Sequence, residues 1–197
     1  MYKTSNDSLK NLTERALFSA HDARVLGISP SRLSYYIKKK IIERVGRGVY
    51  RGVDSAVDVD FQWEDLVLIA KSVSSGVVCL ISALALYELT DEIPRAHWIA
   101  IPHATTSPKR SMTRFVRMRD VTTGKTSMKL GGETIAIFDR ERTIIDAFRY
   151  LTLEIGIKAL RSAITQKKQK LDIRKLQQYA KKFRVHIDPY IITVTTT

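Results

Sequence analysis

Residues 18–51 read FSAHDARVLGISPSRLSYYIKKKIIERVGRGVYR, and this stretch decides the fold of the N-terminal part of the chain. Ser19 precedes a short amphipathic run that ends at Gly27, and glycine tolerates the left-handed conformation that closes a helix. Ser29 and Pro30 then start another helix at once, because serine is a good N-cap and proline suits the first helical position. Two helices joined by a short glycine turn predict a helix-turn-helix.

The helix that follows Ser29 has one apolar and one polar face. Leu33 and Ile37 share the apolar face, with Tyr36 at its border. A solvated helix usually mixes both signs of charge, but this polar face offers hydroxyls, a phenol and only positive charges. Such groups contact base edges and phosphates. We therefore predict a DNA recognition helix with contacts from Ser31, Arg32, Ser34, Tyr35, Lys38 and Lys39.

The next segment, IIERVGRGVYRG at 41–52, predicts a short hairpin, because two glycines separate two extended runs. Arginines at 44, 47 and 51 are spread along it. A basic hairpin directly after a recognition helix is typical of the wing of a winged helix, which contacts the DNA backbone or minor groove. Upstream, helical spacing predicts one more amphipathic helix, whose apolar positions are Leu9, Leu12, Ala16 and Leu17.

The remaining sequence mixes short strands with helices. The acidic segment 54–59 lacks helical periodicity and is interpreted as a linker. Beyond it we expect a helix over Trp63–Val73, a helix capped by Ser82, strands near 97–102 and 113–119, a hairpin over 127–138, and helices capped by Asp139 and Asp172. The predicted fold class is α+β: a winged helix-turn-helix at 1–53, followed by a mixed α+β domain at 60–197.

The chain is strongly basic, with 33 Lys and Arg against 20 Asp and Glu and a formal net charge of +13. This excess indicates a polyanionic partner, most often nucleic acid, although solubility alone is the simpler explanation. The N-terminal 53 residues hold eleven of these cations, and 158–184 hold ten against a single acid, Asp172. The second group is either a solvated face or a surface for a second DNA segment, an RNA or an acidic protein. Its candidate residues are Lys158, Arg161, Lys167, Lys168, Lys170, Arg174, Lys175, Lys181 and Lys182.

Several classes of function are disfavoured by what the sequence lacks. The single cysteine, Cys79, allows no internal disulfide and lies in an apolar stretch, where a buried thiol is expected. No apolar run is long enough to span a membrane, and residues 1–10 lack the apolar core of a signal peptide, so we expect a cytoplasmic protein. The chain has no phosphate-binding glycine loop, no nucleophile elbow and no strand followed by an E-x-K nuclease motif. Its histidines are scattered, and we predict no catalytic residue, no metal site and no cofactor.

The winged segment quoted above, the sequence LISALALYELTDEIPRAHWIAIP at 80–102 and the "ERT…D" block within 134–150 together resemble the AbiEi family over roughly 12–165. These proteins are antitoxins of abortive-infection (type IV) toxin–antitoxin systems. By motif, the resemblance places Arg32, Ser34, Tyr35 and Lys38 in the recognition helix and Arg47, Tyr50 and Arg51 in the wing.

The resemblance implies a bifunctional protein. The winged domain would bind inverted repeats in double-stranded DNA of its own promoter and repress the operon. The second domain would counter a nucleotidyltransferase-like toxin, without necessarily forming a stable complex with it. No antitoxic residue transfers by motif, so the basic residues of 158–182 are the only candidates for an antitoxin surface. The alternative is a plain winged-helix regulator whose second domain dimerises or senses a ligand.

Overall fold

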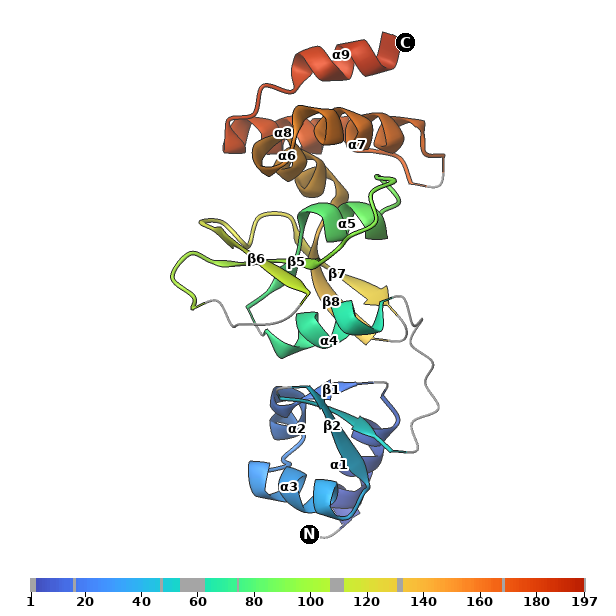
Figure 1. Ribbon diagram of the computed structural model, residues 1–197, viewed down its shortest axis with the longest axis vertical. Coiled ribbons are helices and arrows are strands. Elements are labelled where there is room, and N and C mark those ends of the chain that lie inside the picture. Colours follow the sequence, from blue (N-terminus) through green and yellow to red (C-terminus); the bar gives the residue numbers. More distant parts are fainter. Residues whose placement is uncertain are drawn as a thin grey trace. The chain divides into compact units, whose positions relative to one another are not determined.

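The computed structural model describes residues 3–15, 17–46, 48–53, 63–73, 75–106, 112–130, 133–167 and 169–196 (Figure 1). They group into a first unit, Met1–Ser74 with Met128–Ile135, and a second unit, Ser75–Ser127 with Ala136–Thr197. A small antiparallel sheet with helices is followed by a mixed sheet with further helices, which confirms the predicted α+β class. The predicted linker at 54–59 lies outside the described residues, and the predicted domain boundaries stay a prediction.

The first unit has the arrangement of a winged helix. Its strands form an antiparallel sheet in the order β1-β3-β2, with the hairpin β2–β3 directly after the helix pair α2–α3. Helix α4 contacts all three strands. The elements are α1 (Lys3–Thr13), β1 (Phe18–Ser19), α2 (Ala20–Val25), α3 (Pro30–Lys38), β2 (Ile42–Gly46), β3 (Val49–Gly52) and α4 (Glu64–Ser72).

The helix ends in the first unit follow the signals in the sequence. The Ser19 hydroxyl accepts from the Asp22 amide at 3.1 Å, and the Asp22 carboxylate accepts from the Ser19 amide at 2.7 Å, which completes a capping box. Gly27 has a left-handed φ of +76°. The Ser29 hydroxyl accepts from the amide of Arg32, and Pro30 is the first residue of α3. These features confirm the predicted helix-turn-helix.

The start of the unit differs from the sequence prediction. Helix α1 ends at Thr13, so Leu17 lies outside it, and Ala16 lies outside the described residues. Phe18 is instead in strand β1, opposite Tyr50 of β3. Leu17 is buried, as its place among the predicted apolar positions implies, but it lies outside the helix, and Phe18 is buried as well. A two-residue strand depends on a partner more than thirty positions away, which the local helical spacing does not reveal.

The remaining elements form a mixed sheet and a helical layer. The sheet order is β6-β5-β4-β8-β7, in which β4 runs antiparallel to β5 and parallel to β8, and β5 runs parallel to β6. The elements are β4 (Val77–Val78), α5 (Leu80–Leu86), β5 (His97–Pro102), β6 (Thr113–Met118), β7 (Lys125–Leu130), β8 (Glu133–Phe138), α6 (Arg140–Tyr150), α7 (Leu153–Thr165), α8 (Ile173–Phe183) and α9 (Asp188–Thr196).

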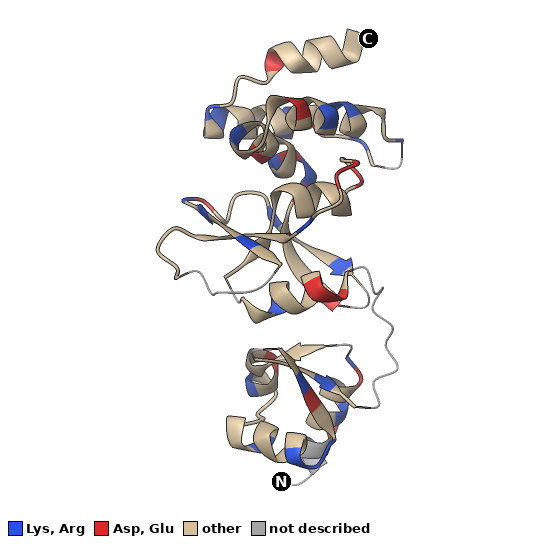
Figure 2. Ribbon diagram, viewed as in Figure 1, with Lys and Arg blue, Asp and Glu red and all other residues tan. Residues whose placement is uncertain are grey.

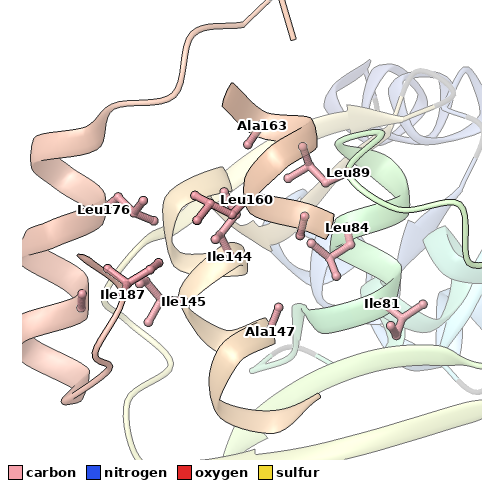
Figure 3. Close-up of a cluster of buried hydrophobic side chains, with 12 residues drawn as sticks. Ile81, Leu84, Leu89, Ile144, Ile145, Ala147, Leu160, Ala163, Leu176 and Ile187 are labelled. Carbon is pink, nitrogen blue, oxygen red and sulfur yellow. The ribbon is translucent and has the colours of Figure 1, made fainter. Parts of the chain in front are cut away.

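Helix α6 lies at the centre of the helical layer and contacts α5, α7 and α8. Figure 3 shows Ile144 of α6 close to Leu160 of α7, with Leu176 of α8 beyond them. Leu84 and Leu89 reach the same cluster from α5 and the loop after it. The C-terminal tail, for which the sequence predicts nothing, forms α9, and this helix contacts α7.

Helix α5 begins earlier than the sequence predicts. Its N-cap residue is Cys79, whereas Ser82, the predicted cap, is inside the helix. The Ser82 hydroxyl accepts a hydrogen bond from the Trp98 amide of β5 at 2.9 Å, so this buried serine joins the helix to the sheet. Cys79 is completely buried, and burial raises the pKa of its thiol well above the ordinary value. A neutral, enclosed thiol agrees with the structural role expected for it.

The "ERT…D" block, residues 141–146, forms a buried charge network on α6. The side chains of Arg142 and Asp146 are both fully buried, and Arg142 Nε donates to Asp146 Oδ2 at 2.8 Å. The same guanidinium donates to the main-chain oxygens of Thr123 at 2.8 Å and Asp120 at 3.0 Å. A buried charge must be paired and hydrogen-bonded, and Arg142 finds its partners both on α6 and in the turn between β6 and β7. The network therefore joins this turn to α6.

Aromatic packing extends the network to α8. The Phe183 ring centre lies 3.9 Å from the guanidinium carbon of Arg142 and 4.7 Å from that of Arg149. Arg149 also donates to the buried Asp146 carboxylate at 2.7 Å. The motif that marks the family resemblance thus has a structural role: it fixes α8 and the β6–β7 turn against α6.

Candidate nucleic-acid interface

The six residues predicted for the recognition helix lie together on the outward face of α3 or immediately after it. Leu33 and Tyr36 are buried and hold the helix on the core of the first unit. The outward residues are all exposed: Ser31, Arg32, Ser34, Tyr35, Lys38 and Lys39. None of them is acidic, so this face carries positive charge and hydrogen-bonding groups.

Local hydrogen bonds orient some of these side chains. The hydroxyl oxygens of Ser29 and Ser31 lie 2.9 Å apart at the start of α3. The Ser34 hydroxyl donates to the main-chain oxygen of Pro30 at 3.1 Å, so only its acceptor capacity is left for a partner. Tyr35 is 54% exposed, and Lys39 Nζ lies 5.9 Å from the centre of its ring. Tyr35 is therefore the most prominent aromatic group that α3 presents to solvent.

The residues predicted for the wing differ in their surroundings. Arg44 is exposed on β2, and its Nε donates to the main-chain oxygen of Gly46 at 3.2 Å. The Tyr50 ring stacks on Phe18, with ring centres 5.7 Å apart, and so contributes to the core. Arg47 lies outside the described residues.

Arg51 has acidic partners that the sequence analysis missed. Its guanidinium lies 2.6 Å from the Glu43 carboxylate on β2 and 3.4 Å from the Glu64 carboxylate on α4. In Figure 2, acidic segments (red) are visible on the hairpin of the first unit and at the start of α4. The Glu43 partner follows from cross-strand pairing, since Glu43 is opposite Arg51 in the hairpin. No sequence signal indicates Glu64, because the contact depends on how α4 packs.

The basic residues predicted in the second unit divide into two groups. Lys158 Nζ lies 2.7 Å from Glu154, Lys175 Nζ lies 3.0 Å from Asp139, and Lys182 Nζ lies 3.1 Å from Asp120. The others that the structure describes are exposed side chains: Arg161, Lys167, Lys170, Arg174 and Lys181. Lys168 lies outside the described residues.

Two of the paired lysines, Lys175 and Lys182, help to hold α8 in place. Burial alone raises the pKa of Asp120, but hydrogen bonds from Thr123 and Lys182 outweigh it and hold the pKa well below its ordinary value. Tyr179 of α8 donates to Asp139 at 2.9 Å, and burial together with this hydrogen bond raises the pKa of Tyr179 to about 12. Lys175 and Lys182 are therefore engaged within the unit, and the outward basic face of α8 consists of Arg174 and Lys181.

The described parts of the chain show neither a metal-binding cluster nor a membrane-spanning helix. No group of three or more His, Cys, Asp or Glu side chains there is placed to hold a metal ion. Among the helices described, none combines the length and apolar character needed to cross a membrane.

Comparison with known proteins agrees with the winged-helix geometry. The fold resembles the crystal structure of the RV2827C protein from Mycobacterium tuberculosis, with a TM-score of 0.53 over 92% of this chain and 72% of that one. Sequence identity is 11%, so this likeness concerns the fold alone. No curated protein matched the sequence. Residues 9–51, which run from α1 to β3, match the model of a family described as "Transcriptional regulator, AbiEi antitoxin".

Proposed function

We propose that this chain is a transcriptional repressor that binds an inverted repeat in double-stranded DNA of its own promoter. The observation that supports this most directly is the outward face of α3, where six exposed polar or basic side chains stand together without an acid. The family match over residues 9–51 supports a regulatory or antitoxin role.

In the proposed complex, α3 lies in the major groove. The Arg32 guanidinium can contact a guanine edge with two hydrogen bonds, and Tyr35 and Ser31 offer hydroxyls to neighbouring bases. Lys38 and Lys39, at the end of the helix, contact phosphates and supply affinity without sequence preference. In the wing, Arg44 and Arg47 contact the backbone, while Arg51 chiefly positions the wing through Glu43 and Glu64.

The DNA-binding proposal is tested by titrating the full-length protein against its own promoter fragment and a scrambled fragment of equal length. We expect tighter binding to the promoter, by a factor of about 10³ or more at physiological salt. We also expect both affinities to fall as salt rises, because phosphate contacts release counterions. Equal affinity for the two fragments would overturn sequence-specific recognition.

We further propose that the second unit acts as an antitoxin against a nucleotidyltransferase-like toxin. This assignment follows the family resemblance, and the exposed basic residues Lys167, Lys170, Arg174 and Lys181 are its candidate surface. The alternative is a regulator whose second unit dimerises or senses a ligand.

Co-expression separates antitoxin activity from repression. The full-length protein with Arg32→Ala and Tyr35→Ala is expressed from a foreign promoter together with the neighbouring toxin gene. We expect this variant to rescue growth as well as wild type, because the changed residues belong to the DNA-binding face. Adding Arg174→Glu and Lys181→Glu is expected to reduce the rescue. Absence of rescue by the wild-type protein, with both proteins present on immunoblots, would support the plain regulator instead.

A further inference from the structure

The second unit has a cavity of about 620 Å³ between the loop after α5 and one face of α7. The loop contributes Asp91, Glu92 and Ile93, and α7 contributes Lys158 and Arg161. The base of the loop is fixed, because Gln166 Nε2 donates to the main-chain oxygens of Tyr87 at 3.2 Å and Glu88 at 3.1 Å. We call the surface around this cavity the bipolar patch.

The two walls of the bipolar patch carry opposite charges. On the loop wall Asp91 and Glu92 outnumber Arg95, which also lines the cavity, so this wall is acidic on balance. Lys158 and Arg161, three residues apart on α7, form the basic wall. Within the part of the chain that the structure describes, Asp91, Glu92 and Arg161 make no ion pair. The pKa of Lys158 is raised chiefly by its hydrogen bond with Glu154, and Glu92 and Asp91 add to this shift. The walls therefore attract each other across the cavity without closing it.

An exposed isoleucine stands beside these charges. The Ile93 side chain is 87% exposed, the largest exposed fraction of any large apolar side chain among the described residues. An apolar side chain flanked by charges of both signs is typical of a protein contact, in which the apolar group is buried and the charges fix the orientation.

We propose that the bipolar patch pairs with the same patch of a second copy of this chain. A twofold axis that passes through the cavity, between the two walls, brings the acidic wall of one copy opposite the basic wall of the other, and repeats the contact on the far side of the axis. A patch with adjacent walls of opposite sign is complementary to itself in this arrangement. A nucleic acid does not fit as well, because its phosphates would face Asp91 and Glu92.

Pairing of this kind serves the proposed repressor, because an inverted repeat binds two copies of a protein related by a twofold axis. This consequence rests on the proposed function. The association itself does not, since it concerns the second unit and can be measured without DNA.

Sedimentation velocity of the full-length protein over a range of concentrations tests the pairing. We expect reversible association that weakens as salt rises. Asp91→Lys with Glu92→Lys should weaken it by at least about tenfold, and Lys158→Glu with Arg161→Glu should do the same, because each brings like charges together. An equimolar mixture of the two double variants should associate again, because their walls are then complementary.

Arg174→Glu with Lys181→Glu is the matched control for the Lys158 and Arg161 variant, because it makes the same charge change on exposed residues of α8. This variant should associate as wild type does, and circular dichroism verifies that all variants are folded. A wild-type protein that stays monomeric at every concentration overturns the proposal. The proposal is also overturned if both patch variants associate as strongly as wild type, or if the equimolar mixture of the two variants fails to associate. Binding of each variant to a single DNA half-site separates these outcomes from failure of the repressor proposal.

Discussion

Replacing Arg142 by methionine is expected to lower the free energy of unfolding of the second unit by about 3–5 kcal/mol. The side chain is completely buried, and methionine keeps its unbranched stem while removing the charge. The change leaves the main-chain oxygens of Asp120 and Thr123 without this donor, and removes one of the two guanidiniums that pair with Asp146. Urea denaturation followed by circular dichroism measures the loss, and hydrogen exchange of the α6 amides assigns it to the second unit.

Arg149→Met is the matched control for this prediction. Arg149 also pairs with Asp146, but its side chain is 26% exposed, so water replaces much of what is lost. We expect a smaller cost than for Arg142→Met, because Asp146 then keeps its fully buried partner. Adding Asp146→Leu to Arg142→Met should recover part of the stability, because the buried carboxylate that has lost its Arg142 partner is then gone. If Arg142→Met and Arg149→Met cost the same, the buried network is not what stabilises α6.

The parts of the fold that the sequence predicts are those set by neighbouring residues. Ser29 and Pro30 start α3 in the structure as they do in the sequence pattern, because a cap acts on amides two or three residues away. Asp139 and Asp172 cap α6 and α8 for the same reason. The wing hairpin was likewise predictable, since its turn lies within a few residues at Gly46 and Gly48.

Features that depend on distant partners were not predictable in this way. Strand β1 exists because Phe18 pairs with Tyr50, and Ser82 is inside α5 because its hydroxyl accepts from Trp98. For the candidate site, the spacing predicted which side chains of α3 face outward. It gave no indication that Glu64 approaches Arg51, because that contact depends on the packing of α4 against the wing.

Arg32→Ala and Tyr35→Ala are each expected to reduce affinity for promoter DNA by about 1–3 kcal/mol, with much less change on scrambled DNA. The reason is that a base contact is lost only where the correct base is present. Both residues are exposed on α3, and the core contacts of that helix come from Leu33 and Tyr36, so the variants should stay folded. Fluorescence anisotropy with both DNA fragments at several salt concentrations measures the specific and non-specific affinities.

A wing variant distinguishes base recognition from simple attraction to DNA. Arg44→Ala should weaken binding to both fragments alike. It should also reduce the slope of log affinity against log salt concentration by about 1, the value expected for one lost phosphate contact. Arg51→Ala should have a smaller direct effect, because Glu43 and Glu64 already neutralise its guanidinium. If Arg32→Ala and Tyr35→Ala behave as Arg44→Ala does, α3 supplies only charge. Sequence recognition would then have to come from another part of the chain or from the shape of the DNA.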